Sequence, residues 1–210
     1  MSTLSGYQRA KSRGGTAKAQ GTKDLLRQEA IDLFYEHGYS RTPIRKITES
    51  LHVENTIIYY YYKSKDELLF SIIDTIADDL INDLQDIVER VDDPLERLRQ
   101  MIYMQIVIFK HRKKEVKIFV EDNDKLPPHL HHKIQERQRR IYDIYSHQIK
   151  RLLRLGTVKD IEPSVIIFSL FGMINWIYRW FNEDGPLTIE EVANRTIQIF
   201  LSGIVREGDA

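Results

Sequence analysis

The sequence has no cysteine among its 210 residues, which excludes disulfides, thiol nucleophiles and thiolate metal sites. It also lacks any apolar run near the roughly 18–20 residues that a helix needs to cross a bilayer, so no membrane association is expected. A Gly-rich phosphate loop, a nucleophile elbow and a His-Glu-x-x-His motif are absent as well. These absences favour a cytoplasmic protein that is not an enzyme and uses neither a cofactor nor a metal.

The chain also has no net charge, since it carries 31 basic and 31 acidic residues. The charges are unevenly placed, because every charged side chain in residues 1–23 is basic, and the rest of the chain therefore carries a net negative charge. A basic end on an acidic body attracts phosphate to one end of the molecule. Residues 1–21 are rich in Gly, Ser, Ala and Lys and poor in large apolar groups, which predicts a basic, flexible arm.

Helical periodicity begins near Thr22 and predicts an all-α fold. We expect Gly38 to cap the first helix, and Ser64 and Thr188 to open capping boxes. The first three helices form a small head over 22–68, and the remaining six form a larger body over 69–210. Proline and capping signals place the nine helices at about 22–37, 43–51, 54–61, 65–91, 94–111, 114–121, 128–155, 163–182 and 189–205.

Residues 39–69 have the spacing of a helix-turn-helix, in which the second of two short helices enters the major groove of DNA. Thr42 is expected to be the N-cap of the first, at a helix end that suits a phosphate. On the second, Ile58 and Tyr62 are expected to pack inward, while Asn55 and its exposed neighbours face base edges and phosphates. The DNA-contacting side chains predicted for this motif are Ser40, Arg41, Thr42, Arg45, Asn55, Thr56, Tyr59, Tyr60, Tyr61 and Lys65.

The four consecutive tyrosines at 59–62 leave an alternative open, because aromatic residues also favour β-strands. The capping signal at Ser64 requires a turn directly behind them and favours the helix.

Residues 22–69 resemble the N-terminal domain of the tetracycline-repressor (TetR) family, whose pattern is roughly G-Y-x-x-T, then I-A, then G-V-S-x-x-T-L-Y-x-H-F-x-S-K-E-x-L. The resemblance implies a homodimeric transcriptional repressor on a palindromic operator, with recognition helices roughly 34–36 Å apart. It also implies a six-helix C-terminal domain for ligand binding and dimerisation, and release of DNA when a small effector binds. The matching residues are Gly38, Tyr39, Thr42, Ile47, Val53, Ile58, Tyr59, Lys63, Ser64, Lys65, Glu67 and Leu68.

Several positions depart from this pattern. His52 replaces the turn glycine, Glu54 replaces the usual capping serine, and Ile57 stands where a hydroxyl often contacts phosphate. Tyr61 and Tyr62 replace the common His-Phe pair. The expected fold tolerates these changes, but the operator sequence cannot be carried over from relatives.

The helices at about 163–182 and 189–205 are the most apolar late in the chain. The resemblance implies that they form a four-helix bundle with their copies in a second subunit. The stretch GMINWIYRWFNEDGPLTIEEVANR also resembles a TetR subgroup that controls fatty-acid degradation and responds to acyl-coenzyme A. The residues that match this subgroup are Asn175, Trp176, Arg179, Trp180, Phe181, Gly185, Leu187, Thr188, Glu190 and Glu191.

An acyl chain needs a deep apolar pocket, and the phosphates and adenine of coenzyme A need cations and an aromatic surface. Trp176 and Trp180 could equally pack in the core or at the dimer interface, with the nearby arginines solvated. The ligand-binding side chains predicted for an acyl-coenzyme A effector are Ile106, Phe119, Arg140, Tyr145, Phe171, Asn175, Trp176, Arg179 and Trp180.

Other functions remain open. The effector could be another hydrophobic molecule, such as a drug or efflux substrate, or the protein could bind DNA without any effector. His129, His131 and His132 could hold a metal, although their place just behind Pro127-Pro128 favours a polar helix start at the surface.

Overall fold

The computed structural model describes residues 15–206, and within this range the chain is all-helical, as predicted, with a single isolated antiparallel bridge between Val158 and Val205. No helix of this range is both long and apolar enough to cross a membrane. The described elements are α2 (Gly15–His37), α3 (Ile44–Ser50), α4 (Thr56–Tyr61), α5 (Lys65–Arg90), α6 (Pro94–Val107), α7 (Phe109–Asp122), η1 (Asn123–Lys125), α8 (Pro128–Arg154), α9 (Pro163–Trp180) and α10 (Ile189–Ile204).

Two predicted boundaries are wrong. Helix α2 begins at Gly15, so residues 15–21 are helical and do not belong to a flexible arm. The alanine, lysine and glutamine residues of this stretch are strong helix formers, which outweighed the glycine. The arm predicted for residues 1–14 lies outside the described range. In the body, the expected break near 111–114 is a kink at Arg112 inside α7, whereas α6 already ends at Val107.

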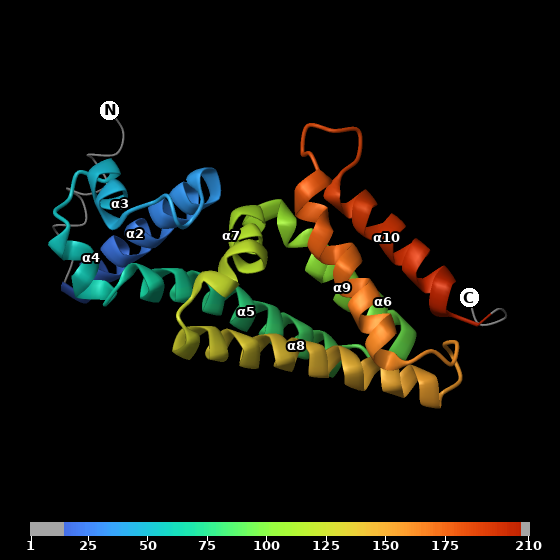
Figure 1. The fold of residues 1–210 in the computed structure, drawn as a ribbon. Coiled ribbons are helices and arrows are strands. Elements are labelled where there is room, and N and C mark those ends of the chain that lie inside the picture. The colour runs from blue at the N-terminus through green and yellow to red at the C-terminus, as the bar shows by residue number, and fades with distance from the viewer. Residues whose placement is uncertain (1–14, 207–210) are drawn as a thin grey trace.

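Helices α2, α3 and α4 form the head at one end of the molecule, and α5 runs from the head into the body (Figure 1). Gly38 closes α2 with a φ of 82°, as predicted. The Ser64 side chain caps α5 by accepting a hydrogen bond from the Glu67 amide at 3.1 Å. Tyr59, Tyr60 and Tyr61 lie in helix α4 and Tyr62 caps its end, so the strand alternative is wrong.

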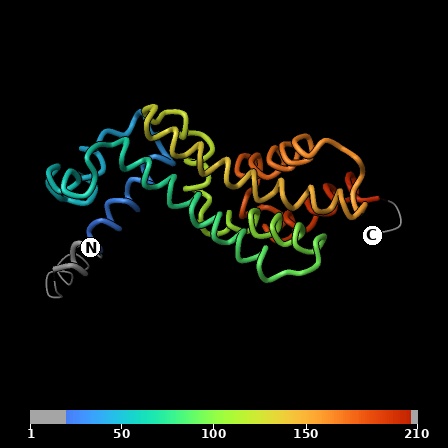
Figure 2. Tube along the Cα trace, turned by 90° about the horizontal axis from the view of Figure 1, so that it is seen from below, coloured from blue at the N-terminus to red at the C-terminus, as the bar shows by residue number. Residues whose placement is uncertain are grey.

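The body is an arrangement of long helices in which α5 and α8 lie side by side and α10 packs on α6 and α9 (Figures 1 and 2). Pro94 and Pro163 occupy the first positions of α6 and α9, where a missing N–H costs no hydrogen bond. The predicted capping box of α10 is complete: Thr188 and Glu191 exchange both hydrogen bonds, at 2.8 and 3.2 Å.

Two hydrophobic cores share α5. Its residues 68–73 pack in the core of the head, and its residues 76–87 pack in the core of the body. The core of the head also receives Ile118, Leu126, Leu130 and Ile134 from the end of α7 and the start of α8. The head is therefore completed by side chains that lie far outside residues 22–68.

Candidate nucleic-acid interface and ligand cavity

The turn between α3 and α4 is tight and fixed by backbone hydrogen bonds. His52 adopts a φ of 53°, the left-handed conformation that glycine adopts most readily. Its amide donates to the Glu49 carbonyl at 3.1 Å, and the Val53 amide donates to Thr48 at 3.0 Å. The buried Thr48 hydroxyl also contacts the Asn55 side-chain oxygen. The two short helices are therefore held at a defined angle without the glycine of the TetR pattern.

The outer face of α4 carries the exposed side chains that the sequence predicts. Tyr59 and Tyr60 are 56% and 78% exposed, and Thr56 is exposed at the first turn. Tyr61 is half-buried, and its ring meets the Tyr60 ring edge-on at 4.9 Å. On the inner face Ile58 is buried, as expected. This surface presents aromatic hydroxyls and a threonine at one end of the molecule.

Thr42 does not lie where the sequence places it. Pro43, not Thr42, is the N-cap of α3, and it makes no side-chain capping bond. The Thr42 side chain is fully buried, and its hydroxyl donates to the carbonyls of Gly38 and Leu33 at 2.9 and 3.2 Å. The prediction that it contacts phosphate is wrong for this conformation, because the hydroxyl instead ties the loop after α2 to the interior.

Lys65 also turns inward. Its ammonium group donates to the Tyr39 carbonyl at 2.8 Å and lies 4.0 Å from the centre of the Tyr39 ring. Burial lowers the pKa of Lys65, and burial together with the hydrogen bond to Asp66 raises the pKa of Tyr39. Lys65 thus joins the loop after α2 to the start of α5, and because it is only partly buried its predicted phosphate contact stays a prediction.

The remaining predicted DNA contacts are exposed. Ser40 and Arg41 lie in the loop before α3, and Arg41 donates to the His37 carbonyl at 2.7 Å. Arg45 is exposed on α3 and pairs with Glu49 at 2.6 Å, an interaction that raises the pKa of the guanidinium. Asn55 is exposed at the N-terminus of α4, although its oxygen faces Thr48.

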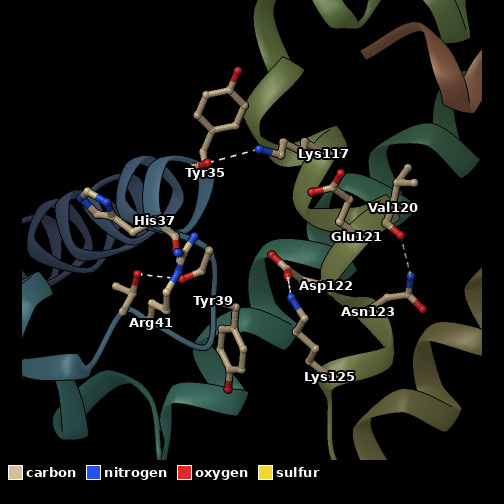
Figure 3. A network of polar contacts seen from close by, with 12 residues as sticks. Tyr35, His37, Tyr39, Arg41, Lys117, Val120, Glu121, Asp122, Asn123 and Lys125 are labelled. Carbon is tan, nitrogen blue, oxygen red and sulfur yellow. Dashed lines mark hydrogen bonds and ion pairs between the residues drawn. The ribbon is translucent and has the colours of Figure 1, made fainter. Parts of the chain in front are cut away.

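Helix α7 bridges the head and the body. Lys114 pairs with Asp32 of α2 at 2.7 Å, and Lys117 donates to the Tyr35 carbonyl at 3.4 Å, a contact that Figure 3 shows. On the body side, Arg112 pairs with Asp79 of α5 at 2.5 Å. Figure 3 also shows Asp122 and Lys125 paired where α7 passes into η1. One helix therefore contacts both the head and the elements around the body's interior.

The body contains a cavity of about 500 Å³ between α5, α6, α7, α8 and α9. This volume lies in the usual range for small-molecule sites, roughly 300–1,000 Å³. Exposed side chains form its rim, and buried ones form its floor. Its lining residues are Leu80, Gln105, Phe119, Gln138, Arg139, Ile141, Tyr142, Asp143, Phe168, Phe171 and Asn175.

Of the predicted ligand-binding residues, Phe119, Phe171 and Asn175 line the cavity. Tyr145 is fully buried behind the wall, where its ring packs edge-on against Phe171 at 5.2 Å. Ile106 is a buried core residue that does not line the cavity.

The two predicted cations are placed elsewhere. Arg140 donates to Gln85 at 3.3 Å, and Arg179 pairs with Glu121 at 3.1 Å. The cavity's only lining cation among the described residues is Arg139, whose Nε lies 4.0 Å from the Asp143 carboxylate.

Trp176 and Trp180 face outward from the cavity, at 58% and 53% exposure. The Arg179 guanidinium lies 4.9 Å from the centre of the Trp176 ring. Other large apolar side chains of α9 and α10 are also exposed, and we call the set the α9 surface: Val165, Phe168, Trp176 and Trp180 of α9 and Ile199 of α10, of which Phe168 also lies at the cavity rim. This placement agrees with the packing alternative for the tryptophans rather than with a role in the ligand pocket.

Sequence reasoning missed Gln105, the polar residue on the cavity floor. The buried residues of α6 are Arg97, Leu98, Met101, Ile102, Gln105 and Ile106, so Gln105 is a polar residue among the apolar residues that follow Arg97. A glutamine among buried apolar residues was the sequence signal that could have identified this cavity residue. The histidine cluster shows no ligand arrangement: within residues 15–206 no group of three potential metal ligands converges, and His131 instead contacts the Asn123 carbonyl.

Comparison with known proteins agrees with this geometry. The family description "Bacterial regulatory proteins, tetR family" matches residues 26–72, and "Tetracyclin repressor-like, C-terminal domain" matches residues 91–204. The transcriptional repressor KstR2 of Mycobacterium tuberculosis is 24% identical over 186 residues, which cover 87% of this chain and 92% of KstR2.

Two solved structures are similar over most of their length. KstR2 superposes with a TM-score of 0.82 at 23% identity, covering 89% of this chain and 96% of KstR2. AibR, solved in complex with isovaleryl coenzyme A and operator DNA, superposes with a TM-score of 0.79 at 26% identity, covering 84% of this chain and 96% of AibR. The helix-turn-helix head, the helical body and both family matches place the chain in the TetR family of bacterial transcriptional regulators.

Proposed function

We propose that this protein is a transcriptional repressor that binds a palindromic operator as a homodimer and releases it when an acyl-coenzyme A occupies the body. The observation that carries the proposal is the apolar cavity of about 500 Å³, which lies in the same body that is tied to the DNA-binding head through α7. AibR, which this chain resembles, was solved with both an acyl-coenzyme A and operator DNA.

In this proposal the outer face of α4 reads the operator. Thr56, Tyr59 and Tyr60 are free to reach base edges and phosphates, while Arg41 and Arg45 add positive charge beside them. Tyrosine hydroxyls and arginines mainly contact phosphate and so fix the position of the protein on the duplex. Two copies joined through the α9 surface would present two such faces to one operator.

The acyl group would occupy the apolar interior between Phe119, Ile141 and Phe171, and the coenzyme would lie outside the rim beside Arg139. Binding can release DNA only if the ligand prefers one arrangement of the heads over the other. Phe119 offers a physical route for this preference, because it lines the cavity and also packs against the cores of both the head and the body.

The experiment is a fluorescence-anisotropy titration of the purified protein on a duplex selected from a random library, followed by addition of isovaleryl-, octanoyl- or palmitoyl-coenzyme A. We expect at least one thioester to weaken DNA binding by tenfold or more, which corresponds to about 1.4 kcal/mol. Free coenzyme A is the control and should have no effect. If no thioester of any chain length changes the affinity, the effector is not an acyl-coenzyme A.

A variant at the cavity rim tests whether the effect passes through this site. Gln138→Trp should block the entrance from a half-buried position and abolish the response while leaving DNA affinity unchanged. Gln135→Trp, on the exposed face of the same helix, is the matched control and should respond like the wild type.

One observation favours a second candidate effector. Since Arg140 and Arg179 are engaged elsewhere and Asp143 accompanies Arg139 at the rim, the cavity mouth has little net positive charge. An uncharged hydrophobic molecule, such as a drug or efflux substrate, would suit that rim. Release of DNA by such a compound and not by thioesters would support this alternative.

A further inference from the structure

Gln105 lies on the floor of the cavity and forms a polar pair with Tyr145, which is buried behind it. The Tyr145 hydroxyl donates to the Gln105 side-chain oxygen at 2.6 Å, and both residues are buried. Burial raises the pKa of Tyr145 far above its usual range, so the hydroxyl keeps its proton and remains a donor.

This pair has more donors than it uses. A tyrosine hydroxyl carries one donor hydrogen and a glutamine amide carries two, while the single bond between the residues consumes one of the three. The same count holds if the amide is rotated by 180°. No other hydrogen bond of Gln105 or Tyr145 is present within the described chain, so the Gln105 amide, which lines the cavity, has donor hydrogens without an acceptor from the protein.

The position of the pair determines which part of a ligand would meet it. Arg139, Asp143 and Phe168 at the rim are exposed, whereas Gln105 on the floor is buried. Gln105 and Asn175 also line a small inner space of about 30 Å³ that continues from the floor between α5, α6, α7 and α9. The end of a ligand that enters first therefore reaches two carboxamides, Gln105 and Asn175, after passing an apolar wall.

We propose that the effector carries a carbonyl oxygen at the end that enters the cavity first, and that Gln105 selects ligands by donating a hydrogen bond to that oxygen. The ligand class is an apolar body with an oxo group far from the rim, such as an oxo-acyl chain or a cyclic ketone. A ligand without this oxygen covers the Gln105 donors without pairing them, and sites built around a hydrogen bond reject such analogues strongly. The inference rests on the proposed function only in taking this cavity as the effector site.

The test compares two probes of nearly equal shape, 4-phenyl-2-butanone and butylbenzene, which differ by one carbonyl group. Their affinities for the full-length protein are measured by titration calorimetry. We expect the ketone to bind at least about tenfold more tightly than the hydrocarbon. Equal affinities, preference for the hydrocarbon, or absence of binding by both probes would each overturn the inference.

Variants assign the preference to Gln105. The double variant Gln105→Met/Tyr145→Phe removes the polar pair at nearly constant volume and should bring the two affinities within about twofold of each other. Gln138→Met is the matched control, because it removes a carboxamide from the rim of the same cavity, and it should keep the wild-type preference. Preservation of the ketone preference in the double variant would contradict a role for Gln105.

A spectroscopic measurement keeps the test valid if the double variant folds poorly. With the ketone labelled by ¹³C at its carbonyl, hydrogen bonding to Gln105 should shift the bound resonance downfield in the wild type and in Gln138→Met. In Tyr145→Phe, where Gln105 is no longer oriented, the shift should become smaller. Neither probe contains coenzyme A, so failure of thioesters to release DNA and failure of this selection are separate results.

Discussion

Two aromatic surfaces of the molecule are exposed to a similar degree but differ in their surroundings. On α4, Tyr59 and Tyr60 stand beside the polar Thr56 and Glu54, whereas Trp176 and Trp180 belong to the apolar α9 surface. Tyrosine hydroxyls beside polar groups suit a hydrated, charged partner, and tryptophans on an apolar patch suit burial against a protein. The exposure of an aromatic side chain therefore does not identify its partner, but its neighbours do.

The largest effect is expected at the α9 surface. Trp180→Glu combined with Ile199→Glu should turn the proposed dimer into a monomer, because both side chains are more than half exposed and a second copy would bury them. Losing the second head removes the gain from bivalent binding, which is roughly 10²–10⁴ in affinity. Analytical ultracentrifugation and anisotropy titrations measure the two effects. Leu155→Glu, an exposed apolar residue outside the α9 surface, should change neither.

A smaller effect is expected on α4. Tyr59→Ala combined with Tyr60→Ala should weaken operator binding by roughly tenfold or more, through lost contacts to the DNA backbone, without changing the oligomeric state. The control is Tyr62→Phe, which removes one hydroxyl from a buried ring at the end of the same helix. Dissociation of the proposed dimer in the alanine variant would contradict the assignment of the α4 tyrosines to DNA and of the α9 surface to the second copy.

A third test concerns the loop that supports the tyrosine surface. Thr42→Val should lower the free energy of unfolding by about 1–2 kcal/mol, because two carbonyls in the interior lose their donor. Urea denaturation measures this change, and Ser40→Ala, an exposed neighbour, should leave stability unchanged. If Thr42→Val instead loses DNA affinity at unchanged stability, the result would support the phosphate contact that the sequence predicts for Thr42.

The smallest effect is expected in the turn before α4. His52→Gly should raise the free energy of unfolding by at most about 1 kcal/mol, since glycine adopts a positive φ without steric cost but loses more entropy on folding. His52→Val should lower it, because a β-branched residue is strained at this φ. Urea denaturation of both variants gives the comparison, and destabilisation by glycine would show that the imidazole itself makes a stabilising contact.

Much of the fold could be predicted because local signals agree with the tertiary structure. The apolar periodicity, Pro94, Pro163 and the capping residues Ser64 and Thr188 fixed most helix ends within a few residues. The error at Thr42 has a different origin. Its sequence context suits an N-cap, and only the packing of the loop against α2 turns the hydroxyl inward.

The cavity was harder to predict than the head because an apolar helix face has three possible destinations: the core, a partner or a ligand. Trp176 and Trp180 match a ligand-binding pattern in sequence, yet they lie on the outer side of α9, while Phe171 and Asn175 of the same helix line the cavity. Rotation of α9 about its axis decides between these roles, and it depends on the packing of α8 and α10.

Because α5 contributes to two cores, its length sets the orientation of the head relative to the body. Each residue inserted into an α-helix rotates the downstream part of the helix by about 100° and advances it by about 1.5 Å. One extra residue between Ile73 and Ile76 would therefore turn the head away from the α7 and α8 side chains that complete its core, and it would point α4 in another direction relative to the α9 surface. The number of residues in α5 thus determines the separation and the orientation of the two heads in a dimer. Insertions and deletions in α5, more than substitutions, would therefore change which arrangement of half-sites the dimer can bind.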